Sequence, residues 1–119
     1  MKKNNDSLDS LRDALRRFAA ARDWQQFHTP KNLAMALSVE AAELLEHFQW
    51  LTPEQSTRFD ATGKRAVEDE IADVLLYLTR LADVLDIDLL AAARRKMRVN
   101  ARKYPVRRAK GNARKYNAF

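Results

Sequence analysis

Residues 30–50 read PKNLAMALSVEAAELLEHFQW. With Leu37 set at about 0° on a wheel of about 100° per residue, four further apolar side chains fall within about 40° of it: Leu33, Ala41, Leu44 and Phe48. Glu40 falls at about −60°, at the edge of the apolar stripe, and Glu43 lies about 60° further round. The pattern predicts an amphipathic helix with two carboxylates at the border of its buried face.

A second segment, residues 67–81, repeats this arrangement. With Val67 at about 0°, Glu70 again falls at about −60° and Asp73 about 60° further round, while four apolar residues lie within about 40°: Ile71, Val74, Leu78 and Leu81. Four carboxylates turned toward an interior repel one another and lose hydration, so a hard divalent cation with oxygen ligands is the natural partner. Two solvated helix edges with surface ion pairs are the alternative, but two motifs in phase favour a metal site.

The residue types limit which metal could bind. The chain has no cysteine and only two histidines, His28 and His47, which is fewer of the Cys and His ligands than a zinc site usually needs. A di-iron bundle site uses Glu-x-x-His motifs, whereas Glu43 is followed three residues later by Glu46. Ligands that are all oxygen point to Mg²⁺, with Mn²⁺ as the alternative. Because Mg²⁺ commonly completes its shell with waters and substrate phosphates, we expect a phosphorylated substrate and metal-assisted hydrolysis.

Composition predicts a single all-α domain over residues 1–119. The chain has only two glycines and three prolines, and no segment alternates with period two. No apolar run is long enough for a membrane span, and Met1-Lys2-Lys3 is followed by polar residues rather than a signal core, so we expect a cytoplasmic protein without membrane contact. The helices carry more apolar surface than a chain of this size can easily cover, which predicts a homo-oligomer.

Capping residues and prolines predict where the helices begin and end. Long helices are expected over four approximate ranges: 7–22 (capped by Ser7 or Asp6), 30–50, 64–85 and 88–104. A capping box from Thr52 to Gln55 predicts a short helical turn, and Thr62-Gly63 is interpreted as a break before the third helix. The remaining ranges are predicted to be irregular: a frayed start over 1–6, a loop over 23–29 and an extended basic tail over about 105–119.

Charge is divided unevenly along the chain. Residues 1–88 hold 11 Lys and Arg with all 16 Asp and Glu, whereas residues 89–119 hold 11 Lys and Arg and no acid. Such a segment suits polyanions: nucleic acid, a membrane surface or phosphate groups. Lys96, Asn100 and Lys103 are spaced to line one helix face, which is suited to holding phosphate, although an ordinary solvated basic face has the same pattern.

Aromatic residues accompany the acidic motifs. Trp50 and Tyr77 each lie seven residues after a motif carboxylate, so each projects from that helix face two turns further on. Together with Trp24 they could stack on a base or close a pocket, and the alternative is a core or interface role. His28 is interpreted first as a hydrogen-bonding loop residue, with substrate contact as its other possible role.

Taken together, the two acidic motifs and Lys96-x-x-x-Asn100-x-x-Lys103-Tyr104-Pro105 resemble those of the MazG-like all-α nucleotide pyrophosphohydrolases. Three further stretches are most similar to the dCTP pyrophosphatase branch of that family: ARDWQQFHTPKN at 21–32, FQW at 48–50 and RKY at 114–116. The resemblance covers residues 8–117. Some close relatives carry a histidine in the first helix at the place of Leu15.

The resemblance implies a four-helix unit that assembles as a dimer or a dimer of dimers. It also implies Mg²⁺-dependent hydrolysis of a nucleoside triphosphate, dCTP or a related pyrimidine deoxynucleotide, to the monophosphate and pyrophosphate. The implied metal-binding catalytic residues are Glu40, Glu43, Glu70 and Asp73. The implied contacts to phosphate or sugar are Lys96, Asn100, Lys103, Tyr104, Arg114, Lys115 and Tyr116. The implied base pocket consists of Trp24, Trp50 and Tyr77, with His28 as a further candidate.

Two other functions stay open on the residues alone. A helical nucleic-acid-binding module without catalysis would use the basic segment, and its affinity would fall steeply with salt and need no Mg²⁺. That reading leaves the acidic pairs without a role. A catalytically silent scaffold that binds metal for assembly would show a metal-dependent oligomer mass and no nucleotide hydrolysis.

Overall fold

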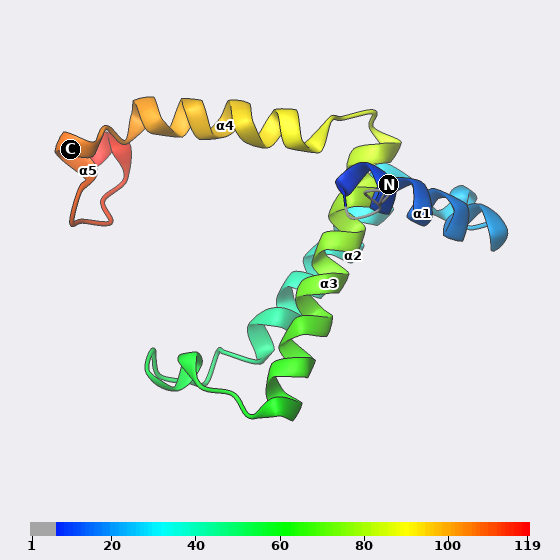
Figure 1. Ribbon diagram of the computed structural model, residues 1–119, viewed down its shortest axis with the longest axis horizontal. Coiled ribbons are helices and arrows are strands. Elements are labelled where there is room, and N and C mark those ends of the chain that lie inside the picture. The colour runs from blue at the N-terminus through cyan, green and yellow to red at the C-terminus, as the bar shows by residue number, and fades with distance from the viewer. Residues whose placement is uncertain (1–6) are drawn as a thin grey trace, which may run out of the picture. The chain divides into compact units, whose positions relative to one another are not determined.

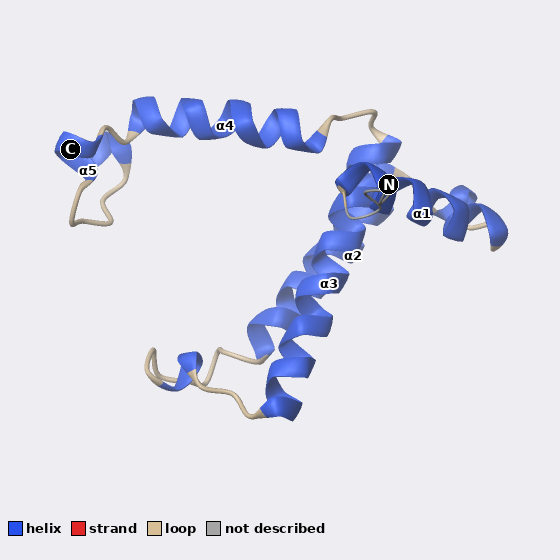
Figure 2. Ribbon diagram, viewed as in Figure 1, coloured by secondary structure: helices blue, strands red, loops and turns tan. Residues whose placement is uncertain are grey.

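The computed structural model describes residues 7–119, and over that range it contains helices and loops but no strand (Figures 1 and 2). Four long helices dominate: α1 (Leu8–Ala21), α2 (Pro30–Glu46), α3 (Ala61–Val84) and α4 (Leu89–Lys103). Four short helical turns accompany them: η1 (Gln25–Phe27), η2 (Gln55–Thr57), α5 (Val106–Ala109) and η3 (Tyr116–Ala118). The predicted all-α class with four long helices is confirmed, and the predicted frayed start at 1–6 lies outside the described residues.

The chain forms two compact units that divide between Asp86 and Ile87. The first unit contains α1, α2 and α3, and the second contains α4, α5 and η3. No helix within residues 7–119 combines the length and the apolar character that crossing a membrane requires. The grouping of both units into one functional domain stays a prediction.

In the first unit α2 and α3 are the main packed pair and lie side by side, and α1 packs against α3 (Figure 1). The buried apolar residues among those described are few: Ala19, Leu33 and Ala82. Leu33, at 2% exposure, is the largest side chain that is fully buried. Burial of a leucine contributes about 1.5–3 kcal/mol, so this small core leaves the unit with a modest apolar contribution to stability.

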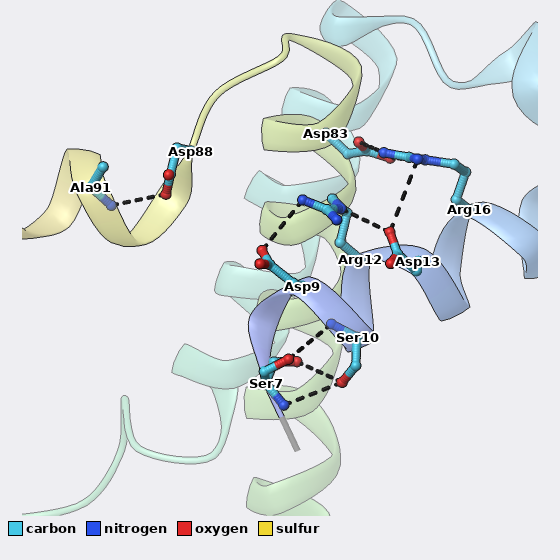
Figure 3. Close-up of polar contacts among 9 residues, drawn as sticks. All are labelled: Ser7, Asp9, Ser10, Arg12, Asp13, Arg16, Asp83, Asp88 and Ala91. Carbon is cyan, nitrogen blue, oxygen red and sulfur yellow. Dashed lines mark hydrogen bonds and ion pairs between the residues drawn. The ribbon is translucent and has the colours of Figure 1, made fainter. Parts of the chain in front are cut away.

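Local side-chain caps determine where three of the long helices begin. Ser7 Oγ accepts from Ser10 N at 3.0 Å and Ser10 Oγ accepts from Ser7 N at 3.2 Å, a reciprocal capping box (Figure 3). Thr29 and Asp88 each accept from the backbone N–H three residues further on, at 3.2 and 3.0 Å. Such caps are each worth about 0.5–2 kcal/mol. The predicted starts of α1, α2 and α4 are therefore confirmed.

The third long helix begins earlier than predicted, at Ala61 rather than Lys64. Asp60 Oδ1 accepts from Gly63 N at 2.7 Å and so caps the helix, which makes Gly63 part of the first turn and not a break. A Cβ on Gly63 would lie 3.2 Å from Asp60 Oδ1 and 3.2 Å from the Phe59 ring. Glycine therefore permits the close approach that this cap requires.

The end of α2 and the C-terminal tail also differ from the prediction. The helix ends at Glu46 rather than Trp50, because the N–H groups of His47 and Phe48 bond three residues back and tighten the chain into turns. The tail, predicted to be extended, contains α5 and η3, and Pro105 serves as the N-cap of α5. The capping box is present as predicted: Thr52 N donates to Gln55 Oε1 at 3.0 Å and Gln55 N donates to Thr52 Oγ1 at 3.2 Å.

A left-handed residue at the end of α1 sets the position of Trp24. Asp23 has φ of 53°, Trp24 N donates to Ala19 O at 2.9 Å, and Asp23 N donates to Ala20 O at 3.1 Å. These paired bonds form a Schellman turn. The turn brings the Trp24 ring back onto α1, where it meets Phe18 edge to face with ring centres 5.7 Å apart.

Candidate active site

Three glutamates of the first unit converge from α2 and α3. One carboxylate oxygen from each of Glu40, Glu43 and Glu70 lies within 4.8 Å of the other two, and all three residues are half-buried. Oε2 of Glu40 and Oε2 of Glu70 are buried and have no hydrogen-bond partner among the described residues. A buried acceptor without a partner is costly, so the arrangement favours a bound group that is positive.

The electrostatics of the cluster agree with its geometry. The pKa of Glu40 is raised from its usual 4.5 to about 7, mainly by burial and then by the adjacent Glu43 carboxyl and the charges of Asp73 and Glu70. Burial also raises the pKa of Glu70, followed by the negative charge of Glu43. The folded chain therefore holds these carboxylates close together at an energetic cost that a cation would remove.

The donor set fits a hard divalent cation. All the donors are carboxylate oxygens, and none of the ion pairs among the described residues involves Glu40, Glu43 or Glu70. These three glutamates could hold a cation, and Asp73, whose charge acts on both Glu40 and Glu70, lies beside them. Such an ion supplies positive charge to phosphate oxygens and makes water more acidic.

A cavity of about 160 Å³, partly open to solvent, adjoins Asp73 in the same unit. Its wall includes three residues predicted for the base pocket: Trp24, His28 and Tyr77. The Trp24 and His28 rings meet edge to face with centres 6.2 Å apart. The structure thus brings these three predicted residues together next to the carboxylate cluster.

Trp50 is not among the residues that line this cavity. It lies in the turn after α2 and is 87% exposed. Leu15 does line the cavity and gives its wall an apolar side chain there. A contact of Trp50 with substrate stays a prediction.

Arg80 is the residue of this site that sequence reasoning missed. It is 8% exposed, its Nε donates to His28 Nδ1 at 3.0 Å, and its Nη1 donates to Asp83 Oδ2 at 3.1 Å. Asp83 also accepts two hydrogen bonds from Arg16 of α1 (Figure 3), and the Arg16 hydrogen bond is the main cause of the lowered pKa of Asp83. The sequence did contain a sign of its role: Arg80 follows Asp73 by seven residues, so the two residues lie on the same face of the helix.

The predicted phosphate contacts belong to the second unit. Lys96 and Asn100 are exposed on α4, and Lys103 lies on the same face one turn further on. The Tyr104 and Tyr116 rings meet edge to face with centres 6.1 Å apart, and Lys103 Nζ lies 4.8 Å from the centre of the Tyr116 ring. Two exposed basic residues precede that ring in the sequence: Arg114 and Lys115. Contact of this group with a phosphate stays a prediction.

Comparison with known proteins identifies the family. A profile of the MazG-like family matches residues 35–119, which include both acidic motifs and all of α4. The chain belongs to the MazG-like family. It is 41% identical over 112 residues to dCTP pyrophosphatase 1 of Homo sapiens and also to that of Bos taurus. These alignments cover 92% of this chain and 66% of each relative, so the chain spans about two thirds of the length of the curated relatives it matches.

A solved structure shares the MazG-like fold of this chain. A pyrophosphatase from Archaeoglobus fulgidus is 45% identical, with a TM-score of 0.80 over 88% of this chain and 98% of that chain. At this identity the likeness extends to sequence as well as fold. The family resemblance inferred from the acidic motifs and the basic helix is therefore confirmed.

Proposed function

We propose that this MazG-like protein hydrolyses a pyrimidine deoxynucleoside triphosphate, dCTP first among them, to the monophosphate and pyrophosphate in nucleotide-pool house-cleaning. The observation that carries the proposal is the pair of buried, unpartnered oxygens of Glu40 and Glu70 within the cluster of three glutamates. The 41% identity to proteins named dCTP pyrophosphatase 1 supports the choice of substrate.

In this proposal Glu40, Glu43, Glu70 and Asp73 hold the divalent cation, Mg²⁺ or else Mn²⁺. A cation bound there would neutralise phosphate charge and make water a better nucleophile. The protein's own contribution is to fix the four carboxylates on two packed helices, so that little reorganisation is needed when the triphosphate binds. An ionised carboxylate of the cluster, or a nearby one such as Glu46 or Asp69, would accept the proton that water loses as it attacks the α-phosphorus.

Residues in each of the two units offer contacts of a kind that suits a nucleotide. Trp24 and Tyr77 offer apolar ring surface to a base in the cavity beside Asp73. Lys96, Asn100 and Lys103 offer N–H donors, two of them cationic, for phosphate oxygens. Because the leaving pyrophosphate accumulates negative charge, cationic donors of this kind lower the barrier to its departure.

The test is pyrophosphate release from a panel of ribo- and deoxynucleoside triphosphates, measured with Mg²⁺ and with EDTA. We expect metal-dependent release that is fastest with a pyrimidine deoxynucleotide, and its loss in Glu43→Ala and Asp73→Ala with an unchanged circular dichroism spectrum. Glu68→Gln is the matched control, because this α3 side chain is 55% exposed and pairs with Arg65. Normal turnover in both site variants would refute the assignment.

The same panel separates the proposal from the nucleic-acid-binding alternative. A folded protein that releases no pyrophosphate and binds DNA with a steep salt dependence would favour a binding module that uses the basic segment 89–119. Metal-dependent hydrolysis excludes that reading as the main function.

We further propose that the protein acts as a homo-oligomer. Exposed apolar side chains form helical rows on both main helices: Met35 and Val39 on α2, and Ile71, Leu75 and Leu78 on α3. Rows of this kind on a unit with so few buried residues are typical of an interface. Light scattering should give a mass of at least two chains of 13.7 kDa each, and Met35→Glu should lower that mass. A monomeric wild type at assay concentration would contradict the proposal.

A further inference from the structure

The contact between Arg80 and His28 determines which nitrogen of the imidazole carries a proton. Arginine stays protonated at any pH the protein experiences, and its guanidinium nitrogens only donate. Arg80 Nε lies 3.0 Å from His28 Nδ1 and donates to it, so Nδ1 must accept. A neutral imidazole with an accepting Nδ1 carries its proton on Nε2.

The same contact disfavours the charged form of His28. An imidazolium has donors on both nitrogens, so Nδ1–H would face the N–H of Arg80 with no acceptor between them. Burial lowers the pKa of His28, and the positive charge of Arg80 lowers it further. Three other charged groups lie near the pair: Asp83 beside Arg80, Arg16 bonded to Asp83, and Asp73 in the cavity wall. Asp83 bonds the two arginines and not the imidazole.

A network of contacts holds the Arg80 guanidinium in this orientation. The Arg80 and Asp83 side chains are 9% and 10% exposed, and their ion pair spans 3.1 Å. Asp83 is itself held by two hydrogen bonds from Arg16, which ties α1 to α3 at this point (Figure 3). Because Asp83 accepts from both arginines, the buried charges are compensated, and Nε of Arg80 is left to bond His28.

The cavity that His28 lines has about the volume that one six-membered aromatic ring occupies. Its volume of about 160 Å³ is close to the roughly 150 Å³ of an engineered cavity that binds benzene. Trp24 and Tyr77 contribute aromatic surface to its wall. A six-membered pyrimidine ring therefore fits within this space, whereas the two fused rings of a purine exceed it and would extend through the side that is open to solvent. A donor at Nε2 pairs with an acceptor on that ring and not with an exocyclic amino group.

We infer that Arg80 is a positioning residue that holds His28 as a neutral Nε2–H donor, and that this donor selects a pyrimidine base through a ring nitrogen or a carbonyl oxygen. The part that concerns the base rests on the proposed function. The part that concerns the imidazole does not, and the two parts are tested by separate measurements.

The first experiment measures the His28 tautomer by ¹⁵N NMR of the imidazole ring. The chain has two histidines, so in His47→Gln every imidazole signal in the spectrum comes from His28. We expect an unprotonated Nδ1 and a protonated Nε2 that persist to a lower pH than in an ordinary histidine, which titrates near pH 6.5. In Arg80→Gln, His28 should take up its proton at a higher pH than in the native chain, because the positive charge of Arg80 is gone, and it should populate both tautomers. Arg65→Gln, an exposed arginine on the same helix, should change neither signal.

Either of two results would overturn the inference about the imidazole. One is a proton on Nδ1 of His28 in the otherwise native chain. The other is an ordinary titration of His28 near pH 6.5 while Arg80 is in place. Neither result depends on whether the protein hydrolyses a nucleotide.

The second experiment asks whether the donor recognises the base. His28→Phe removes the donor and should raise KM for dCTP by about 2- to 12-fold, the effect of one neutral hydrogen bond, with kcat nearly unchanged. His28→Gln places an amide N–H near the position of Nε2 and should restore most of the loss, which keeps the test valid if Arg80→Gln fails to fold. A fall in kcat alone, or no rescue by glutamine, would contradict base recognition.

A binding measurement separates this inference from the proposed function. If the native protein hydrolyses no nucleotide, dCMP and dAMP are titrated while the His28 Nε2–H signal is followed. A shift with dCMP and none with dAMP supports the inference even though the proposed hydrolysis has failed. No shift with either, or an equal shift with both, overturns it.

Discussion

Replacing Glu40 with glutamine should stabilise the metal-free protein and abolish its response to metal. Glu40 Oε2 is buried without a partner, and a Glu40 oxygen lies within 4.8 Å of oxygens of Glu43 and Glu70. Glutamine keeps the shape of the side chain, removes its charge and offers an N–H to the neighbouring carboxylates. The folded state should therefore gain free energy from a change that removes a ligand.

The distances in the cluster set the size of this gain. Two unit charges 4.8 Å apart repel by about 1 kcal/mol in water and about 3.5 kcal/mol at an effective dielectric constant near 20. The pKa of Glu40, raised from 4.5 to about 7, limits the cost of ionisation to about 3 kcal/mol at about 1.4 kcal/mol per pH unit. Because water reaches the half-buried side chain, we expect a gain of about 1–3 kcal/mol in the free energy of unfolding at pH 8.

The gain has a defined dependence on pH. With its pKa raised to about 7 from 4.5, Glu40 binds a proton more tightly in the folded state than in the unfolded chain. The wild type therefore loses stability from this group as pH rises from 4.5 to 7, and the loss is complete above that range. Glutamine does not titrate, so the advantage of Glu40→Gln should be largest at pH 8 and should shrink toward pH 5.

The assay is urea unfolding followed by circular dichroism at one protein concentration, in EDTA and in Mg²⁺. The wild type should gain stability with Mg²⁺ by mass action and Glu40→Gln should not. Glu68→Gln, whose side chain is 55% exposed, should change stability by no more than about 0.5 kcal/mol. A destabilised Glu40→Gln in EDTA at pH 8, or an unchanged response to Mg²⁺, would refute the reasoning.

Three further predictions concern the first unit. Leu33→Ala should lower the free energy of unfolding by about 2–5 kcal/mol in urea titration, because this side chain is only 2% exposed; a loss below about 1 kcal/mol would contradict its core position. Asp83 has a lowered pKa because Arg16 and Arg80 bind its ionised form. Its contribution to the free energy of unfolding is therefore present near neutral pH and is lost as pH falls through the pKa that Asp83 has in the folded state. Asp83→Asn should therefore be less stable than the wild type at pH 7, with the difference closing in acid, and a constant difference in thermal unfolding from pH 7 to 3 would argue against this. Thr29→Ala should cost about 1 kcal/mol through the lost cap of α2, measured by urea unfolding, whereas an unchanged midpoint would show that the cap is unimportant.

The starts of the helices could be predicted from the sequence because they depend on a few neighbouring residues. The caps at Ser7, Thr29 and Asp88 and the box at Thr52 each bond a residue three positions away, so the signal and the structure lie in the same few residues. The wrong start predicted for α3 is also a local matter. From the sequence alone Gly63 is interpreted as a break, whereas its N–H donates to Asp60 and so forms the cap. Helical spacing likewise placed the paired carboxylates at the edge of each apolar stripe.

Sequence alone therefore determined the helical class, most helix starts and a paired set of carboxylates, because each depends on neighbours along one chain segment. Only the tertiary structure decided which of the carboxylates meet, because the packing of α2 against α3 sets how their faces are aligned. The same holds for Arg80 and His28, which are 52 residues apart and meet through the turn after α1 and the face of α3. That contact depends on where two helices and a loop come together, which no local pattern encodes.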